Sequence, residues 1–123
     1  MNDFFGLKAL IVEDEGSIAL LIEDMLLGLG CEITASAARL SEACEVAQTA
    51  TFDFAVLDVN LDGKPAFPVA DILRERRIPF VFSTGYGASG VPTEFIGHPV
   101  LSKPFSIRNL QSAILQALSR PEA

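Results

Sequence analysis

Two groups of acidic residues each stand directly after a short apolar run of the chain. Ala9–Val12 runs into Glu13 and Asp14, and Phe54–Leu57 runs into Asp58. Such runs are typical of buried strands in a parallel sheet, and ligands of open α/β sheets bind just beyond the carboxyl ends of the strands. Glu13, Asp14 and Asp58 are therefore expected to converge in one crevice. Three negative charges so close together are costly unless a cation neutralises them, and Mg²⁺, a hard ion that prefers oxygen ligands, is the natural candidate.

Three further polar residues stand near the ends of apolar runs. Thr84 follows the run Phe80–Ser83, Lys103 follows the run Val100–Ser102, and Asn60 lies two residues beyond Asp58. A carboxylate can act as a nucleophile and form an acyl phosphate, while a metal ion and a lysine stabilise charge on the transferred group. The set therefore predicts a phosphoryl-transfer site built from positioning and charge neutralisation.

The elements that must position these residues alternate regularly along the chain. Strands are expected at residues 8–12, 32–35, 54–59, 80–83 and 100–102. Helical spacing of apolar residues is found at residues 18–29, 40–47, 69–73 and 107–118. Ser36 is a candidate N-cap for the second helix and Ser106 for the last one. This alternation predicts an α/β fold, a doubly wound parallel sheet of five strands with the flavodoxin-like order 2-1-3-4-5.

Residues 85–99 break the alternation. This stretch should hold the fourth helix, but it contains four glycines and two prolines. A glycine costs about 1 kcal/mol in a helix interior and a proline about 3 kcal/mol. The fourth helix is therefore expected to be short or absent, and the segment mobile or irregular.

Composition narrows the class of protein. The 123 residues are expected to form one domain, residues 1–123, with a net charge of −7. This acidic balance argues against binding to nucleic acid or to anionic membranes. No signal peptide or membrane span is recognisable, so a cytoplasmic location is expected. Cys31 and Cys44 form no motif and are expected to be reduced, packed thiols. The single histidine, His98, is expected to be exposed and uninvolved.

Four motifs in order resemble the receiver domain of two-component response regulators. They are Val12-Glu13-Asp14, Leu57-Asp58-Val59-Asn60-Leu61, Phe82-Ser83-Thr84-Gly85 and Lys103-Pro104-Phe105. The resemblance covers essentially the whole chain and implies a CheY-like version of the flavodoxin-like fold. Each motif alone would be weak, but the four together at near-normal spacing are specific.

The resemblance implies a role for each acidic residue. Asp58 would accept a phosphoryl group from a histidine kinase. The Asp14 and Asp58 carboxylates and the backbone carbonyl of Asn60 would bind Mg²⁺, and Glu13 would act on the metal largely through water. Such a protein is a phosphoacceptor that assists its own phosphorylation and dephosphorylation, and it is not an enzyme in the usual sense.

The resemblance also implies roles for the two remaining residues. Thr84 would donate a hydrogen bond to the phosphoryl group after it arrives. Lys103 would pair with the Asp58 carboxylate or its phosphate. The Lys103–Pro104 peptide bond is expected to be cis, as is usual in the family.

One motif narrows the resemblance to a subfamily. Residues 82–87 resemble the Phe-Ala-Thr-Gly-Xaa-Tyr signature of FAT GUY receivers, although Tyr86 directly follows the glycine here. That subfamily is linked to histidine kinases of the HWE and related classes. Many receivers carry Tyr or Phe three residues before the lysine, where this chain has Val100. We hypothesise that Tyr86, or an order–disorder change of residues 85–99, replaces the aromatic switch.

Other classes of function fit less well. A haloacid-dehalogenase-type phosphatase needs a second carboxylic acid at the position of Asn60. A flavodoxin-like nucleotide-binding module would have its phosphate repelled by the acidic residues 13–15. With the last helix ending near Ser119, a stand-alone signalling module is expected, monomeric or weakly dimeric, that acts on an unknown downstream protein through contacts alone.

Overall fold

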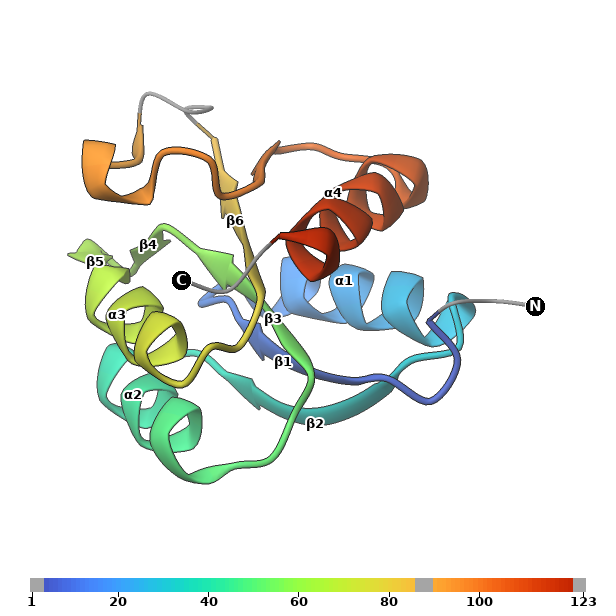
Figure 1. The fold of residues 1–123 in the computed structure, drawn as a ribbon, viewed down its shortest axis with the longest axis horizontal. Helices are drawn as coiled ribbons and strands as arrows, with labels where there is room; N and C mark the ends of the chain where they lie inside the picture. Colours follow the sequence, from blue (N-terminus) through green and yellow to red (C-terminus); the bar gives the residue numbers. More distant parts are fainter. Residues whose placement is uncertain (1–3, 86–89, 121–123) are drawn as a thin grey trace.

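Five parallel strands form the central sheet of the protein. The computed structural model describes residues 4–85 and 90–120. Its strand order is β2-β1-β3-β6-β7 (Figure 1), which confirms the predicted order 2-1-3-4-5. The strands are β1 (Lys8–Val12), β2 (Glu32–Ala37), β3 (Phe54–Asp58), β6 (Phe80–Thr84) and β7 (Val100–Ser102).

Two pairs of helices cover the two faces of this sheet. One face carries α1 (Gly16–Gly28) and α4 (Ile107–Ser119), and the other carries α2 (Leu40–Thr49) and α3 (Phe67–Glu75) (Figure 1). Each strand contributes alternate residues to the two cores, because successive side chains of a strand point to opposite faces. In β1, for example, Ile11 packs under α1 and α4, whereas Leu10 packs under α2 and α3. Burial on both faces explains why the inner strands are mostly apolar, with polar residues near their carboxyl ends.

One predicted helix cap is wrong and the other is confirmed. Ser36 lies in β2, paired with Ile11, so it cannot cap α2. The N-cap of α2 is Arg39, and the Glu42 side chain accepts a hydrogen bond from the Ala38 backbone N–H at 3.2 Å. Ser106 caps α4 as predicted, in a reciprocal pair of 3.1 Å hydrogen bonds with Asn109.

A small hairpin follows β3. Strands β4 (Asn60–Leu61) and β5 (Lys64–Pro65) pair antiparallel across the turn Asp62-Gly63. Both turn residues have positive φ, 51° and 84°, as a two-residue type I′ turn requires. The expected turn at Asp62-Gly63 is therefore present, and the hairpin around it was not predicted.

The stretch between β6 and β7 has no α-helix in the part that the structure describes, residues 90–99. It holds η2 (Thr93–Phe95), a 3₁₀ helix of three residues. This confirms that the fourth helix is short or absent. Tyr86, the candidate switch residue, lies outside the described residues.

Aromatic rings hold this stretch against the sheet. Phe95 is fully buried and packs against Phe67 of α3 and Phe82 of β6, with ring centroids 5.7 and 5.5 Å apart. His98 stacks on Phe80 at 4.4 Å and is partly buried. The expectation that His98 is exposed is therefore wrong, because the aromatic cluster covers one face of its ring.

The surroundings of His98 predict how it titrates. Burial, followed by the positive charges of Arg120 and Arg74, lowers its pKa from 6.5 to about 4. A lowered folded-state pKa means that His98 contributes its full stability above pH 6.5 and loses that stability as the pH falls toward 4. NMR titration of this single imidazole should give a midpoint near pH 4. As the pH falls from 6.5 to 4, the free energy of unfolding of the wild type should drop by up to about 3 kcal/mol more than that of His98→Phe. A midpoint near 6.5 would contradict the packing described here.

The remaining general expectations concern cysteines and membranes. Cys31 and Cys44 are free, and burial raises the pKa of both thiols, in agreement with unreactive packed cysteines. Among the described residues, no helix combines the length and the apolar character that a membrane crossing demands.

Candidate functional site

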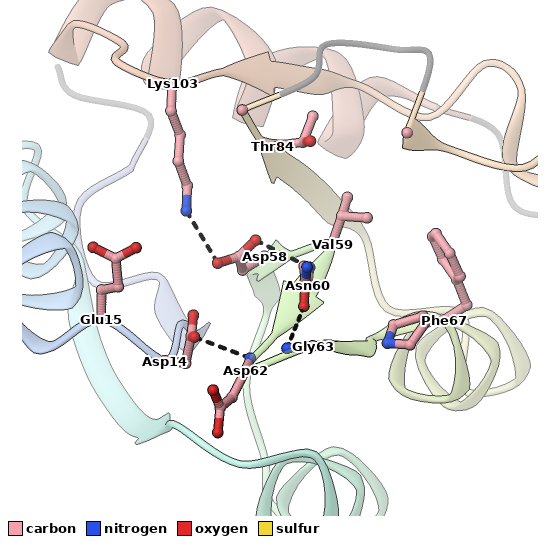
Figure 2. A pocket seen from close by; sticks show the side chains of 13 residues that line it. Asp14, Glu15, Asp58, Val59, Asn60, Asp62, Gly63, Phe67, Thr84 and Lys103 are labelled. Atoms are coloured by element: carbon pink, nitrogen blue, oxygen red, sulfur yellow. Dashed lines mark hydrogen bonds and ion pairs between the residues drawn. The ribbon is translucent and has the colours of Figure 1, made fainter.

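An open cleft of about 580 Å³ lies at the carboxyl ends of the strands (Figure 2). Five of the six residues predicted for the site line it: Asp14, Asp58, Asn60, Thr84 and Lys103. The sixth, Glu13, is buried beside them, 2% exposed. The strand ends thus bring all six predicted residues into one region, although they come from distant parts of the sequence.

A salt-bridge triad joins three of these residues. Lys103 Nζ lies 2.9 Å from Glu13 Oε1 and 3.0 Å from Asp58 Oδ2. Strand alternation places all three side chains on the face covered by α1 and α4, in step with Ile11, Val56 and Leu101. Because β6 lies between β3 and β7, the Lys103 side chain crosses β6 to reach its partners.

Asp58 is held from two sides. Its Oδ1 accepts a 3.1 Å hydrogen bond from the Asn60 backbone N–H, and its Oδ2 accepts one from Lys103 Nζ (Figure 2). The residue is 6% exposed, at the edge of the cleft. The carboxylate is therefore oriented by the fold and still borders open space.

The β4–β5 hairpin forms one wall of the cleft. The Asp62 backbone N–H donates to Asp14 Oδ2 at 3.0 Å, and the Gly63 N–H donates to Asn60 Oδ1 at 2.7 Å (Figure 2). Sequence reasoning missed these two contacts. The signal available for them was Asp62-Gly63 itself, since Asp-Gly is a preferred pair for a two-residue hairpin turn.

The pKa values in the site follow from burial and charge. Burial raises the pKa of Glu13 from 4.5 to about 7, with nearby Asp58 adding to the shift and Lys103 opposing it. Burial also disfavours the Lys103 ammonium, but its contacts with Glu13 and Asp58 prevail and raise the pKa of Lys103. For Asp14, burial is outweighed by hydrogen bonds, first from the Asp62 N–H, so its pKa is lowered. The site thus sets three carboxyl groups, those of Glu13, Asp14 and Asp58, beside one ammonium.

The acidic residues fit a small divalent cation. One oxygen from each of Glu13, Asp14 and Asp58 lies within 4.8 Å of the others. The three carboxylates are thus close enough to converge on one divalent cation, with Glu13 acting on it through water. Glu13 Oε1 is buried, and Lys103 Nζ, 2.9 Å away, is its contact among the described residues. An all-oxygen donor set with excess negative charge suits Mg²⁺.

Thr84 and the lysine motif complete the cleft. Thr84 ends β6, lines the cleft and is 3% exposed, and its carbonyl oxygen accepts a 2.9 Å hydrogen bond from the Lys103 N–H. The Lys103–Pro104 bond is cis, as predicted. Val100, at the position of the usual aromatic switch, pairs with Phe82 and packs on the α2–α3 side.

Comparison with known families agrees with this geometry. The model of the response regulator receiver domain matches residues 9–115, so the chain belongs to this family of two-component signalling modules. In a solved structure, SdrG from Sphingomonas melonis Fr1 is 38% identical with a TM-score of 0.83, and the match covers 92% of this chain and 97% of that chain.

Two other proteins extend the comparison. The phyllosphere-induced regulator PhyR from Methylorubrum extorquens is 31% identical over 120 residues, which are 90% of this chain and 43% of PhyR. The chain thus spans less than half the length of that relative. Similarity to SdrG and PhyR fits the FAT GUY subfamily. The receiver domain of sensor histidine kinase PA1611 from Pseudomonas aeruginosa PAO1 shares the fold at 24% identity, with a TM-score of 0.76 and coverage of 94% and 99%. Its structure holds a magnesium ion in the active-site cleft.

Proposed function

We propose that Asp58 accepts a phosphoryl group from a histidine kinase or phosphotransfer protein in a Mg²⁺-dependent reaction. The observation that carries this proposal is the Asp58 carboxylate, fixed between Lys103 Nζ and the Asn60 N–H at the edge of an open acidic cleft. A fixed nucleophile beside a cationic group is what phosphoryl transfer requires of a protein.

In the proposed reaction, an Asp58 oxygen attacks the phosphorus of a phosphohistidine. The new O–P bond forms as the P–N bond breaks, and the nitrogen keeps the electron pair of that bond. Lys103 Nζ already contacts the Asp58 carboxylate and would stabilise charge on the transferred group. A magnesium ion held by the site would neutralise the remaining charge of the phosphoryl oxygens.

The metal would be held by Asp14, Asp58 and the Asn60 carbonyl, with Glu13 acting largely through water. The support is the carboxylate cluster, in which one oxygen of each residue lies within 4.8 Å of the others. The Asp62 backbone N–H keeps the Asp14 side chain at the cleft. Thr84 lines the same cleft, and its hydroxyl would donate a hydrogen bond to the phosphoryl group.

The partner surface is proposed to include α1. Its exposed side carries Leu20, Leu21 and Leu27, each more than half exposed. An apolar hollow of about 310 Å³ lies between α1 and residues 103–105, next to the lysine motif. An apolar surface beside a phosphoacceptor suits a helical histidine kinase, proposed here to be of the HWE or a related class. We further propose that residues 1–123 form one receiver domain that acts in the cytoplasm as a monomer or weak dimer, signals to a downstream protein through contacts and binds no nucleic acid.

Intact-mass analysis tests this function directly. Incubation with a small acyl-phosphate donor and Mg²⁺ should add one phosphoryl group to the wild type. Asp58→Ala and the wild type in EDTA should show no adduct. Asp71→Asn is the matched control, because Asp71 is an exposed carboxylate of α3 away from the cleft, and it should react like the wild type. Mg²⁺ binding without an adduct would contradict the proposal and favour a constitutive interaction module, whereas an adduct that persists in Asp58→Ala would show that another residue is the phosphoacceptor.

A further inference from the structure

The Ser83 hydroxyl is buried without a partner. Ser83 is 1% exposed, and its Oγ has no hydrogen-bond partner among the residues that the structure describes. A buried polar group without a partner is rare, and it costs about as much as a lost hydrogen bond. Such a hydroxyl inside β6 therefore calls for a partner that moves to it in another state of the protein.

Strand register places Ser83 directly beside the salt-bridge triad. Ser83 pairs with Asp58 of β3 on one side and with Leu101 of β7 on the other. Paired residues in parallel strands share a face, so the Ser83 side chain lies on the α1–α4 side together with Asp58. Lys103 starts beyond β7 and reaches Asp58 across β6, the strand that carries Ser83.

We propose, in an inference that rests on the proposed function, that Ser83 is a positioning residue. Its hydroxyl accepts a hydrogen bond from the Lys103 ammonium when the carboxylates bind a metal ion. The Glu13 and Asp58 oxygens that now face Lys103 cannot serve the ammonium and a divalent cation equally well, and the two positive charges repel each other. Lys103 then needs another acceptor within reach of the same stem. Ser83 Oγ is a buried acceptor on the right face, and an ammonium has three N–H groups to donate.

This arrangement links metal affinity to a residue that does not touch the metal. If Ser83 stabilises the displaced ammonium, its hydroxyl strengthens Mg²⁺ binding, and it does so only through Lys103. Removing the hydroxyl should weaken Mg²⁺ binding about ten- to one-hundred-fold, the equivalent of one hydrogen bond to a charged group. In a protein without the Lys103 ammonium, the same change should have almost no effect, which a double-mutant cycle measures.

The experiment is an NMR titration with Mg²⁺ of the wild type, Ser83→Ala, Lys103→Met and the double variant. Ser83→Cys keeps most of the volume but accepts hydrogen bonds poorly, so it should weaken binding as Ser83→Ala does. Ser102→Ala, at an exposed serine of β7, is the matched control and should bind like the wild type. The Lys103 ε-methylene signal should differ between the wild type and Ser83→Ala in saturating Mg²⁺ and agree in EDTA.

The outcomes separate this inference from the proposed function. Equal Mg²⁺ affinity in the wild type and Ser83→Ala would overturn the role given to Ser83. The same role would be overturned if Ser83→Ala lowered Mg²⁺ affinity as much in the Lys103→Met background as in the wild type. Wild-type affinity in Ser83→Cys also overturns it, because the effect would then be one of packing. Phosphorylation of Asp58 is decided by the intact-mass experiment and does not depend on these results. Folding of Ser83→Ala is checked by its thermal midpoint in EDTA, expected at or above that of the wild type because an unpartnered hydroxyl is removed.

Discussion

Replacing Lys103 with methionine is expected to slow phosphoryl transfer to Asp58 about 100-fold, the usual effect of losing one charge-stabilising donor. The ammonium contacts Asp58 Oδ2 at 3.0 Å and is the cation that the structure places in the triad. Mg²⁺ should bind more tightly to Lys103→Met, because a competing positive charge is gone. Time courses of the phosphoryl adduct at saturating Mg²⁺ measure the rate. A rate within three-fold of the wild type would contradict the role given to Lys103.

Lys103→Met should also lower the free energy of unfolding of the metal-free protein by about 2 kcal/mol or more at pH 8, since it leaves buried carboxylates unpaired. The raised pKa of Glu13, about 7, sets the pH dependence. Glu13 holds its proton at pH 5 and has lost most of it at pH 8, so the cost of Lys103→Met should grow as the pH rises through 7. Denaturant unfolding in EDTA at both pH values tests this. Lys64→Met, at an exposed lysine of β5, is the matched control.

Phe95→Ala should be the most destabilising single change in the stretch before β7. Phe95 is fully buried among Phe67, Phe80 and Phe82, with the Arg74 guanidinium 4.8 Å above its ring. Truncating a buried phenylalanine costs about 3–5 kcal/mol, a large share of the stability of a domain this size. Ile96→Ala is the neighbouring control, since Ile96 is 73% exposed and should change stability by less than about 0.5 kcal/mol.

Amide hydrogen exchange distinguishes two ways in which Phe95→Ala could destabilise the protein. If the ring anchors the stretch, amide hydrogens at residues 93–98 should lose protection before the sheet does. Phe67 also lines the cleft, so loosening should extend toward the hairpin. Uniform loss of protection would mean that Phe95 supports the whole core. Protection unchanged at 93–98 would show that Phe95 does not anchor the stretch.

The residues that carry chemistry could be predicted because each stands at the end of a strand. Apolar runs fix the strands, and parallel strands align their carboxyl ends, so Glu13, Asp58 and Lys103 had to meet. The local sequence around each residue does not show which of the others it contacts or how its pKa is shifted. That Lys103 bridges both carboxylates, and that Glu13 has a raised pKa, depends on strands far apart in the sequence.

The predictions that failed did so for the same physical reason. Ser36 is a good N-cap by type, but its pairing with Ile11 keeps it in β2. His98 looked exposed in a Gly-His-Pro loop, yet Phe80 provides an aromatic surface for its ring. In both cases a tertiary contact outweighed a local preference. The hypothesis on Tyr86 stays untested.

The Asp62-Gly63 turn has a consequence for anyone who wishes to label this protein. Exposed loop tips are ordinarily the safest places for a tag, a fluorophore or an inserted peptide. Here the two amides of the turn hold Asp14 and Asn60 in the cleft, and both turn residues need a left-handed backbone. A cargo inserted there would disturb the acidic site while leaving the sheet intact. Reporter groups therefore belong on the far end of the molecule, away from the carboxyl ends of the strands.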